Sequence, residues 1–310
     1  MTLPMDIAPD VAQALAAGRP VVALESTIIS HGMPCAPYIW IAARVEAIVR
    51  AEGATPATIA ILDGRLTVGL SDEALENLGD PDRDDIQKVS RINLAATVAA
   101  SATGATTVAA TMIIAHLAGI RVFATGGIGG VHRGAETSFD ISADLHELSQ
   151  TPVAVICAGA KAILDIPKTL EVLETLGVPV TTFGQDAFPA FWSRHSSTRS
   201  PARADSTHQI AREIAMRRTL GLAGGHLIAN PIPEADEIPS DVMIPFIEQV
   251  TAEADANADI EGPLVTPFLL QRLFEVTKGR SLDANAALVL NNARLAANIA
   301  ADLSSLERNR

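Results

Sequence analysis

The chain has 310 residues, which is enough for one large α/β domain or two modest ones. Hydrophobic residues make up 48% of it and aromatic residues only 4%, so we expect a core of Ala, Val, Ile and Leu, as in helices packed on a sheet. A formal net charge of −13 argues against nucleic acid or an anionic membrane as the main partner, and an anionic substrate would need a local positive pocket.

Helices and strands alternate along the chain, which is typical of an α/β fold. Capping residues, glycine stops and apolar faces predict helices at residues 9–17, 39–50, 142–148, 169–176, 205–218, 243–254, 266–276 and 281–306. Apolar runs predict strands at residues 20–24, 58–62, 66–70, 122–124, 153–156, 178–183 and 227–229. We therefore predict that residues 1–310 form a single α/β domain, with a mixed or mostly parallel sheet and helices on both faces.

Three segments need separate interpretation. The Asp63-Gly64 pair predicts a tight turn between two of the strands, because glycine accepts positive φ at low cost. Residues 94–120 carry no formal charge, which suggests a membrane span. They are rich in Thr, Ser and Ala and are divided by Gly104, so two small-residue helices in a core are predicted instead. Residues 189–203 are predicted to form a long surface loop.

The cysteines and the first residues indicate the compartment. Cys35 and Cys157 form neither a CxxC pair nor a metal-ligand spacing, and two free thiols in a reducing cytosol are expected. Asp6 and Asp10 lie near the start and no basic leader precedes them, so no signal peptide is expected. The sequence thus predicts a cytoplasmic protein.

A glycine-rich turn at residues 126–130 follows a predicted strand. It is not a dinucleotide fingerprint, since His132 stands where a glycine is needed, and it lacks the end of a Walker A loop. Its bare backbone amides could cradle a phosphate, while a tight packing turn explains the same glycines equally well. His132 and Arg133 come next and could contact a phosphate, although such a pair often lies on an ordinary surface loop.

Carboxylates and a lysine at the ends of predicted strands are the other candidates. Lys161 follows an apolar strand, where burial favours the neutral, nucleophilic amine, although many such lysines are simply exposed. Glu25 also follows a strand and could transfer protons, or it could be an ordinary loop acid. Asp140 and Asp144 flank Ser142, which predicts helix capping, with binding of a hard cation as the alternative.

Several ordered motifs together resemble one family. They are ALESTIISHGMP, PATIAILDGRLTVGL, QKVSR, GATTVAATM, FATGGIGGVHRGAETSFDISADL, CAGAKAILDIPKTLE, ANPIPEADEI and SLDANAALVLNNA, and they extend over residues 21–300. The chain is similar to the pseudouridine-5′-phosphate glycosidase family, also called indigoidine synthase A-like. The resemblance implies reversible cleavage of the C–C glycosidic bond of pseudouridine 5′-phosphate to uracil and ribose 5-phosphate. It also implies a divalent metal, typically Mn²⁺, and a homotrimer.

The same motifs imply roles for individual residues. Glu25 resembles the proton donor, Lys161 the covalent nucleophile and Asp140 the metal ligand, while Asp144 is expected to assist as a second acid or base. Asn285 resembles a catalytic-site amide. The positions that resemble substrate or phosphate contacts are Lys88, Val108, Thr125, His132, Ser142, Ala143 and Asp144. One departure is Ile92-Asn93, where the family often has Arg-Asp, which puts local helix or subunit contacts in question rather than the reaction.

Two other functions compete with this reading. An aldolase or another sugar-phosphate lyase that forms a lysine imine would use the same lysine and phosphate cradle. A sugar-phosphate sensor would bind the ligand without turnover, but it leaves the set of Glu25, Asp140 and Lys161 unexplained.

Overall fold

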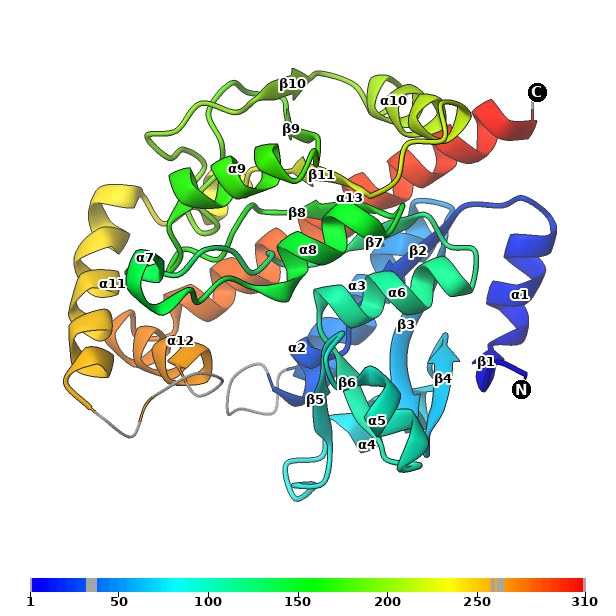
Figure 1. Cartoon of the computed structure of the whole chain (residues 1–310), viewed down its shortest axis with the longest axis horizontal. Coiled ribbons are helices and arrows are strands. Elements are labelled where there is room, and N and C mark those ends of the chain that lie inside the picture. The colour runs from blue at the N-terminus through cyan, green and yellow to red at the C-terminus, as the bar shows by residue number, and fades with distance from the viewer. Residues whose placement is uncertain (1, 32–37, 258–259, 261–264, 309–310) are drawn as a thin grey trace.

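The computed structural model describes residues 2–31, 38–257, 260 and 265–308, and Cys35 lies outside these residues. Within them, one sheet of eleven strands organises the fold (Figure 1). The strands are β1 (Met5–Ile7), β2 (Val21–Leu24), β3 (Thr55–Leu62), β4 (Arg65–Val68), β5 (Gln87–Val89), β6 (Gly104–Thr106), β7 (Val122–Ala124), β8 (Ala154–Cys157), β9 (Val180–Phe183), β10 (Ala202–Ala204) and β11 (His226–Ala229).

The strand order is β1-β4-β3-β2-β7-β8-β11-β9-β10, with β6 pairing β3 and β5. Strand β3 is antiparallel to β4 and β6, and the other pairings are parallel. The sheet is therefore mixed and mostly parallel, as predicted. The neighbours β2, β7, β8 and β11 all run the same way, so their carboxyl ends lie at one edge of the sheet and their amino ends at the other.

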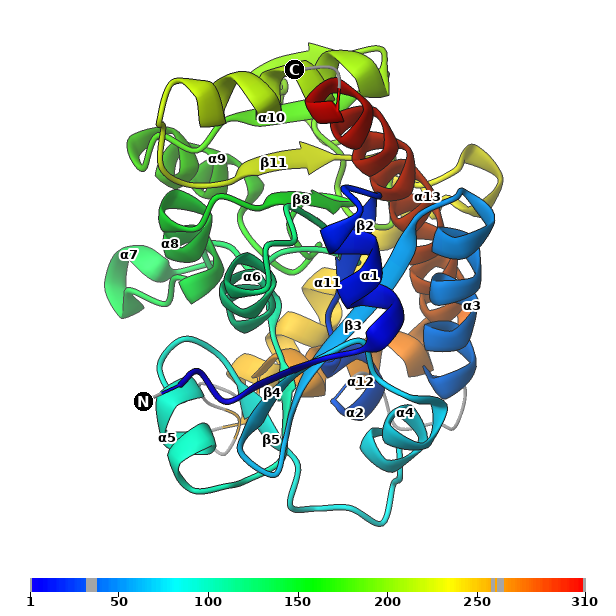
Figure 2. The ribbon, with the colours of Figure 1, turned by 90° about the vertical axis from the view of Figure 1, so that its right-hand side faces the viewer.

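Helices cover both faces of the sheet, which confirms the predicted fold class. In Figure 2, α6, α8 and α9 lie on one side of the strands and α3 and α13 on the other. The helices are α1 (Pro9–Ala16), α2 (Thr27–Ser30), α3 (Tyr38–Ala51), α4 (Asp72–Leu78), α5 (Leu94–Ala99), α6 (Val108–Leu117), α7 (Ala135–Ser138), α8 (Ala143–Gln150), α9 (Ile166–Thr175), α10 (Thr207–Thr219), α11 (Ser240–Asp255), α12 (Val265–Val276) and α13 (Arg280–Arg308), with a 3₁₀ turn at Glu234–Asp236.

Local signals in the sequence set several element ends. Asp63 and Gly64 both have positive φ, at 48° and 76°, and join β3 to β4 in the predicted hairpin. Ser142 caps α8 by accepting the amide of Asp144 at 3.2 Å. Helix α9 begins three residues before the predicted start, because the Asp165 side chain accepts the amide of Lys168 and caps it there.

Two segments differ from the prediction. Residues 94–120 form α5, strand β6 and α6, so a short strand lies between the two predicted helices; its three residues are too few to show a period. In the described residues no helix is both long and apolar enough to cross a membrane. Residues 189–203 are not simply a surface loop: Phe191 and Trp192 are buried, and the segment ends by entering β10. The aromatic side chains of this otherwise polar segment are therefore part of the core.

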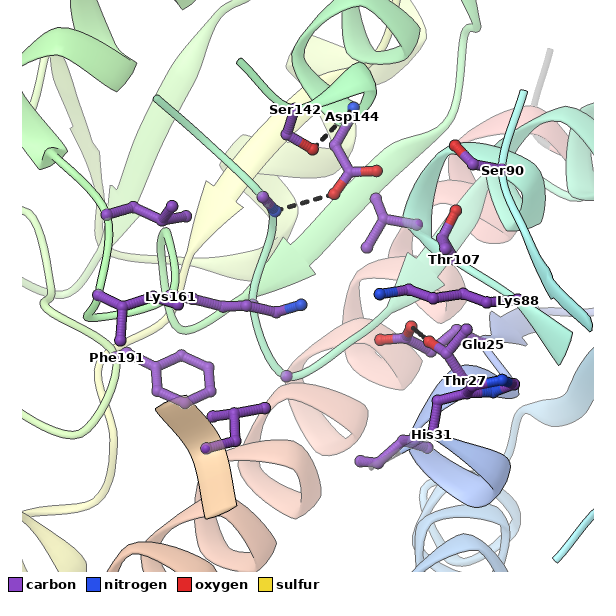
Figure 3. Close-up of a pocket in the computed structure, with 18 of the residues that line it drawn as sticks. Glu25, Thr27, His31, Lys88, Ser90, Thr107, Ser142, Asp144, Lys161 and Phe191 are labelled. Carbon is purple, nitrogen blue, oxygen red and sulfur yellow. Dashed lines mark hydrogen bonds between the residues drawn. The ribbon is translucent and has the colours of Figure 1, made fainter. Parts of the chain in front are cut away.

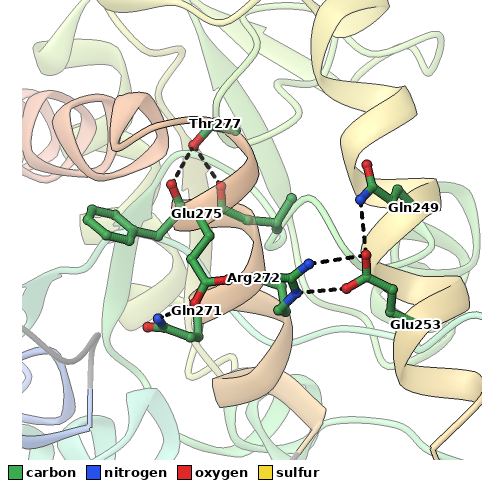
Figure 4. A network of polar contacts seen from close by, with 8 residues as sticks. Gln249, Glu253, Gln271, Arg272, Glu275 and Thr277 are labelled. Atoms are coloured by element: carbon green, nitrogen blue, oxygen red, sulfur yellow. Dashed lines mark hydrogen bonds and ion pairs between the residues drawn. The ribbon is translucent and has the colours of Figure 1, made fainter.

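Helices α11 and α12 are fastened together by a polar network (Figure 4). Arg272 of α12 donates from Nε to Glu253 Oε2 of α11 at 2.7 Å and also pairs with Glu275 on its own helix. Gln249 adds a hydrogen bond to Glu253 at 3.0 Å. The network orients α12, which in turn contributes Leu270 to the cavity described next.

Candidate functional site

A cavity of about 320 Å³ opens at the carboxyl ends of β2, β7 and β8 (Figure 3). This is the edge at which parallel α/β sheets bring loops from several strands together. Of the eleven residues to which the family resemblance assigns roles, nine line it: Glu25, Lys88, Val108, His132, Ser142, Ala143, Asp144, Lys161 and Asn285. Thr125 and Asp140 are the two that do not.

Two lysines face each other across the cavity. Lys161 follows β8, with its backbone amide donating to the Ile128 carbonyl at 3.1 Å, while Lys88 extends from β5 on the opposite wall (Figure 3). Burial, and after it the charge of Lys161, lowers the pKa of Lys88, although Asp144 and Glu25 oppose the shift. This pair supplies the local positive charge that an anionic substrate needs in an acidic chain.

Glu25 is held in place by two hydroxyl groups. Thr27 Oγ1 donates to its Oε2 at 2.6 Å, and Thr125 Oγ1 donates to Oε1. Both carboxylate oxygens therefore have a fixed partner, and the group lines the cavity beside Lys88 (Figure 3). Thr125 is 2% exposed and its hydroxyl is used on Glu25, so the observed contact positions the carboxylate. The role of Thr125 in phosphate binding stays a prediction.

Asp144 links three backbone segments at the edge of the cavity. Its Oδ2 accepts the amide of Gly129 at 2.8 Å, and its Oδ1 accepts the amide of Ala109 at 3.1 Å. These bonds tie the glycine turn to the first turns of α6 and α8, whose first residues Val108 and Ala143 line the cavity. Two helix N-termini thus converge there, which favours an anion.

The glycine turn is required for close packing as well as for access. A side chain at Gly127 would come within 2.6 Å of the Phe191 ring, and one at Gly129 would collide with Ser142. Gly126, Gly127 and Gly129 nevertheless line the cavity. The packing interpretation of the turn is therefore confirmed, while phosphate binding by its amides stays a prediction.

Apolar side chains form part of the cavity wall, and one of them, Phe191, lies on the same side as Lys161 (Figure 3). This apolar wall combines residues from distant segments: Ile163, Leu164, Phe191, Leu270 and Val289. Next to it, Trp192 Nε1 donates to Asn285 Oδ1 at 2.6 Å, which fixes the predicted amide of α13. Phe191 adopts a φ of 61°, unusual for a bulky residue, and it packs edge-on against Trp192 with ring centroids 5.0 Å apart.

Several lining residues were not predicted, namely Thr27, His31, Ser90, Thr107 and Phe191. Ser90 lies two residues after Lys88, and Thr107 lies just before Val108. Their closeness to these predicted positions is the feature of the sequence that could have identified them. The Thr107 hydroxyl is buried and has no hydrogen-bond partner among the described residues. Burial, and then the charge of Lys88, lowers the pKa of His31. These groups are additional candidates for ligand contacts.

Asp140 lies outside the cavity lining, and half of its side chain is exposed. His132 Nδ1 is 3.8 Å from its Oδ2, and the described residues contain no cluster of three or more His, Cys, Asp or Glu side chains around a common point. An exposed carboxylate of this kind fits a hard cation that keeps most of its water ligands. It does not form a closed protein cage.

Comparison with known proteins gives one family. The model of the family described as indigoidine synthase A like protein matches residues 10–302. A pseudouridine-5′-phosphate glycosidase of Paracoccus denitrificans is 64% identical, with 96% of this chain and 98% of the relative aligned. One from Jannaschia sp. is 62% identical, over 98% of this chain and all of the relative.

Two solved structures are similar to the chain over nearly its whole length. The prealnumycin C-glycosynthase AlnA, in complex with ribulose 5-phosphate, matches with a TM-score of 0.92 and 38% identity over the full length of both chains. An indigoidine synthase A-like protein from Thermotoga maritima matches with a TM-score of 0.87 and 36% identity over 97% of each chain.

Proposed function

The chain belongs to the indigoidine synthase A-like family, and from this premise we propose that it is a pseudouridine-5′-phosphate glycosidase. The reaction is the reversible cleavage of the C–C glycosidic bond of pseudouridine 5′-phosphate to uracil and ribose 5-phosphate. The observation that carries the proposal is that Lys161 and Glu25, from two different strands, line one cavity together with Lys88. The names of relatives at 64% and 62% identity support the choice of substrate.

A lysine suits the cleavage of a carbon–carbon glycosidic bond. In an N-glycoside the base can leave as a nitrogen anion, whereas in a C-glycoside simple departure would leave a poorly stabilised carbanion. A covalent bond between an amine and the sugar divides this difficult step into easier ones. Lys161 takes this role, because it reaches the middle of the cavity as an extended side chain (Figure 3).

The proposed reaction passes through a ring-opened sugar bonded to Lys161. The neutral amine of Lys161 bonds to C1′ while the C1′–O4′ bond breaks, and Glu25 gives a proton to O4′. Glu25 then removes a proton from the new ammonium group. The nitrogen lone pair forms the C1′=N bond of an imine as the bond from C1′ to C5 of uracil breaks, and C5 receives that proton from Glu25. Water hydrolyses the protonated imine, which releases ribose 5-phosphate and the free amine, and the proton set free returns to Glu25.

Groups around the reacting atoms hold the substrate. The phosphate binds at the N-terminus of α8, where Ser142 and Ala143 line the cavity, with His132 and Lys88 adding positive or hydrogen-bonding contacts. This remote binding holds C1′ against the amine and reduces the entropic cost of attack. The flat base lies against the apolar wall near Phe191. Asp144, whose two oxygens accept backbone amides, shapes this end of the cavity and assists as a second acid or base.

A divalent cation such as Mn²⁺ is part of the proposal. Asp140 would hold it through one carboxylate with mostly water ligands, and the cation would supply positive charge beside the anionic substrate. The replacement Asp140→Ala is expected to remove saturable Mn²⁺ binding, measured by electron paramagnetic resonance. If the variant binds Mn²⁺ and is activated by it as well as the wild type, the assignment is wrong.

The chain is further proposed to act in the cytoplasm as a homotrimer. Three large apolar side chains on segments near the cavity support subunit contacts, because Ile92 is 94%, Phe139 80% and Ile141 41% exposed. Light scattering coupled to size exclusion measures the mass directly. A monomer at micromolar concentration would contradict the trimer without affecting the reaction.

The activity is tested by following uracil release from pseudouridine 5′-phosphate with Mn²⁺ present. Uracil and ribose 5-phosphate in equal amounts support the proposal, and the reverse mixture should form the C-glycoside. The second candidate, a C-glycosynthase for an acceptor other than uracil, is favoured by the likeness to AlnA. It predicts bond formation with such acceptors but no release of uracil. Tight binding of ribose 5-phosphate without turnover would favour a sensor, and an aldolase would cleave the sugar chain instead.

A further inference from the structure

A second and larger cavity lies at the opposite edge of the sheet. Its volume is about 690 Å³, against about 320 Å³ for the first. Arg19 lies just before β2, Arg121 directly before β7, Ala154 at the start of β8 and His226 at the start of β11. The same parallel strands therefore end at the first cavity and begin at the second. A strand of four residues separates the two by about 13 Å.

The lining of this amino-end cavity is strongly basic in an acidic chain. It contains five of the chain's 23 lysine and arginine residues and a single described carboxylate, Glu307. The arginines are Arg19, Arg121, Arg217, Arg218 and Arg308. Since the net charge of the whole chain is −13, this concentration of positive charge is local and produces a field that attracts anions.

Most of these arginines have no carboxylate partner in the described part of the chain. Glu307 pairs with Arg121 and, at 3.3 Å, with Arg218. Arg217 donates only to the Ala223 carbonyl at 2.8 Å, and Arg308 to the Gly18 carbonyl at 3.0 Å. The Arg19 side chain has no hydrogen bond or ion pair among the described residues, and only its backbone amide donates, to the Ala14 carbonyl at 2.8 Å. Guanidinium groups that remain unpaired around a cavity are suited to bidentate contacts with phosphate oxygens.

Two of the arginines are desolvated. Burial lowers the pKa of Arg217, which has no carboxylate partner among the described residues. Burial, followed by the neighbouring charge of Arg218, lowers the pKa of Arg121 to about 10, so the guanidinium remains charged at neutral pH while it is desolvated and repelled. Glu307 already offsets part of this for Arg121, and a bound anion would do the same for Arg217. The apolar side chains of Leu15, Ile214 and Leu222 line the same cavity and suit the non-phosphate part of a small molecule.

His226 adds a buried and partly unsatisfied imidazole to the wall of the amino-end cavity. It is 3% exposed, and its Nε2 lies 2.9 Å from Thr181 Oγ1, but its buried Nδ1 has no hydrogen-bond partner among the described residues. Glu213 Oε2 is 4.0 Å away on the Nε2 side. A buried polar atom without a partner is costly, so His226 places an unsatisfied polar group beside the cavity that it lines.

We propose that the amino-end cavity binds a small molecule that carries two or more phosphate groups. The volume is within the range of ligand sites, and the surplus of four arginines over the single carboxylate exceeds what one monophosphate needs. Duplex nucleic acid does not fit, because the strongly acidic chain would repel it outside this one cavity. A nucleoside diphosphate and inorganic pyrophosphate share the required chemistry.

Calorimetric titration of the full chain with pyrophosphate and with ADP tests the site. Arg19→Gln is the main variant, since Arg19 is exposed and its side chain makes no hydrogen bond or ion pair among the described residues, so the fold should be unaffected. Arg308→Gln is the second variant. Arg203→Gln is the matched control, because Arg203 is an exposed arginine on β10 that pairs with Asp205 outside the cavity. Lys88→Gln alters the first cavity and so shows whether the anions bind there instead.

We expect both cavity variants to bind about ten- to hundredfold more weakly than the wild type, as for the loss of one charge-assisted contact. Arg203→Gln and Lys88→Gln should bind as the wild type does, and salt should weaken binding in all four. Tighter binding of ADP than of pyrophosphate identifies a nucleotide, and equal binding identifies the diphosphate group alone. Absence of binding, or loss of binding in Lys88→Gln rather than in Arg19→Gln, overturns the proposal. Neither result would affect the proposed reaction.

Discussion

The two ends of the same parallel strands carry different kinds of positive charge. The carboxyl end presents Lys88 and Lys161 beside Glu25, whose carboxylate is held by hydroxyl groups. The amino end presents five arginines and one glutamate, Glu307, which is already ion-paired. A lysine amine can lose its proton and react as a nucleophile, whereas a guanidinium remains charged and binds. One end is therefore suited to covalent chemistry and the other to holding an anion.

Helix α13 connects the two ends. It contributes Asn285 and Val289 to the first cavity and Ser304, Glu307 and Arg308 to the second. At 1.5 Å per residue, Val289 and Ser304 are about 22 Å apart along the helix. Between them lies Asn292, which is fully buried.

The largest effect that the comparison predicts is the loss of the reactive amine. Lys161→Arg keeps the positive charge but removes the nucleophile, so we expect the rate of uracil release to fall by at least about a thousandfold. Lys168→Arg is the control, because Lys168 is exposed and paired with Glu136 away from the cavity. Activity close to the wild-type rate in Lys161→Arg would show that positive charge alone is sufficient at this end.

The next effect concerns the proton carrier. Glu25→Gln preserves the size of the side chain but cannot transfer a proton, and a loss of about 100- to 1000-fold in kcat is expected. Thr27→Val and Thr125→Val, which each remove one hydrogen bond that orients Glu25, should cost much less. If the threonine variants lose as much as Glu25→Gln, then Glu25 acts mainly through structure.

The third prediction concerns the amino end, where His226 makes the stability of the folded chain depend on pH. Burial, with the charge of Arg217 second, lowers the pKa of His226 to about 4. Because the unfolded chain takes up a proton near pH 6.5 and the folded chain does not until about pH 4, His226 makes stability decrease as pH falls through this range. The slope is about 1.4 kcal/mol per pH unit. Urea unfolding at several pH values should show this contribution, and it should vanish in His226→Gln; an unchanged slope would contradict it.

The smallest expected effect is a change in the free energy of unfolding at Asn292, which lies on α13 between the two cavities. Asn292 Nδ2 donates to the Thr125 carbonyl at 2.8 Å, and its Oδ1 accepts from Asn230 at 3.0 Å. Asn292→Ala leaves these buried groups without partners and should reduce the free energy of unfolding by about 2 kcal/mol. The neighbouring Asn291→Ala, which loses one bond to the Pro231 carbonyl, should cost less. Equal losses in urea unfolding would contradict a special role for Asn292.

The sequence was informative where signals are local. The hairpin at Asp63-Gly64, the cap at Ser142 and the long final helix follow from neighbouring residues, and motifs brought nine site residues into one cavity. Short strands such as β6 were missed, because three residues show no period. The burial of Phe191 was missed because it depends on Gly127, which is 64 positions away. The arginine cavity collects single residues from separate turns, and no spacing in the sequence relates them.

The central claim is that Lys161 forms a covalent imine with the open-chain sugar. The direct measurement is to incubate the protein with ribose 5-phosphate and Mn²⁺, reduce with borohydride, and map the modified residue by peptide mass spectrometry. The account predicts one reduced pentose phosphate per chain, attached at Lys161, and none in Lys161→Arg. Protein that stays unmodified while it releases uracil, or a label on Lys88 instead, would contradict it.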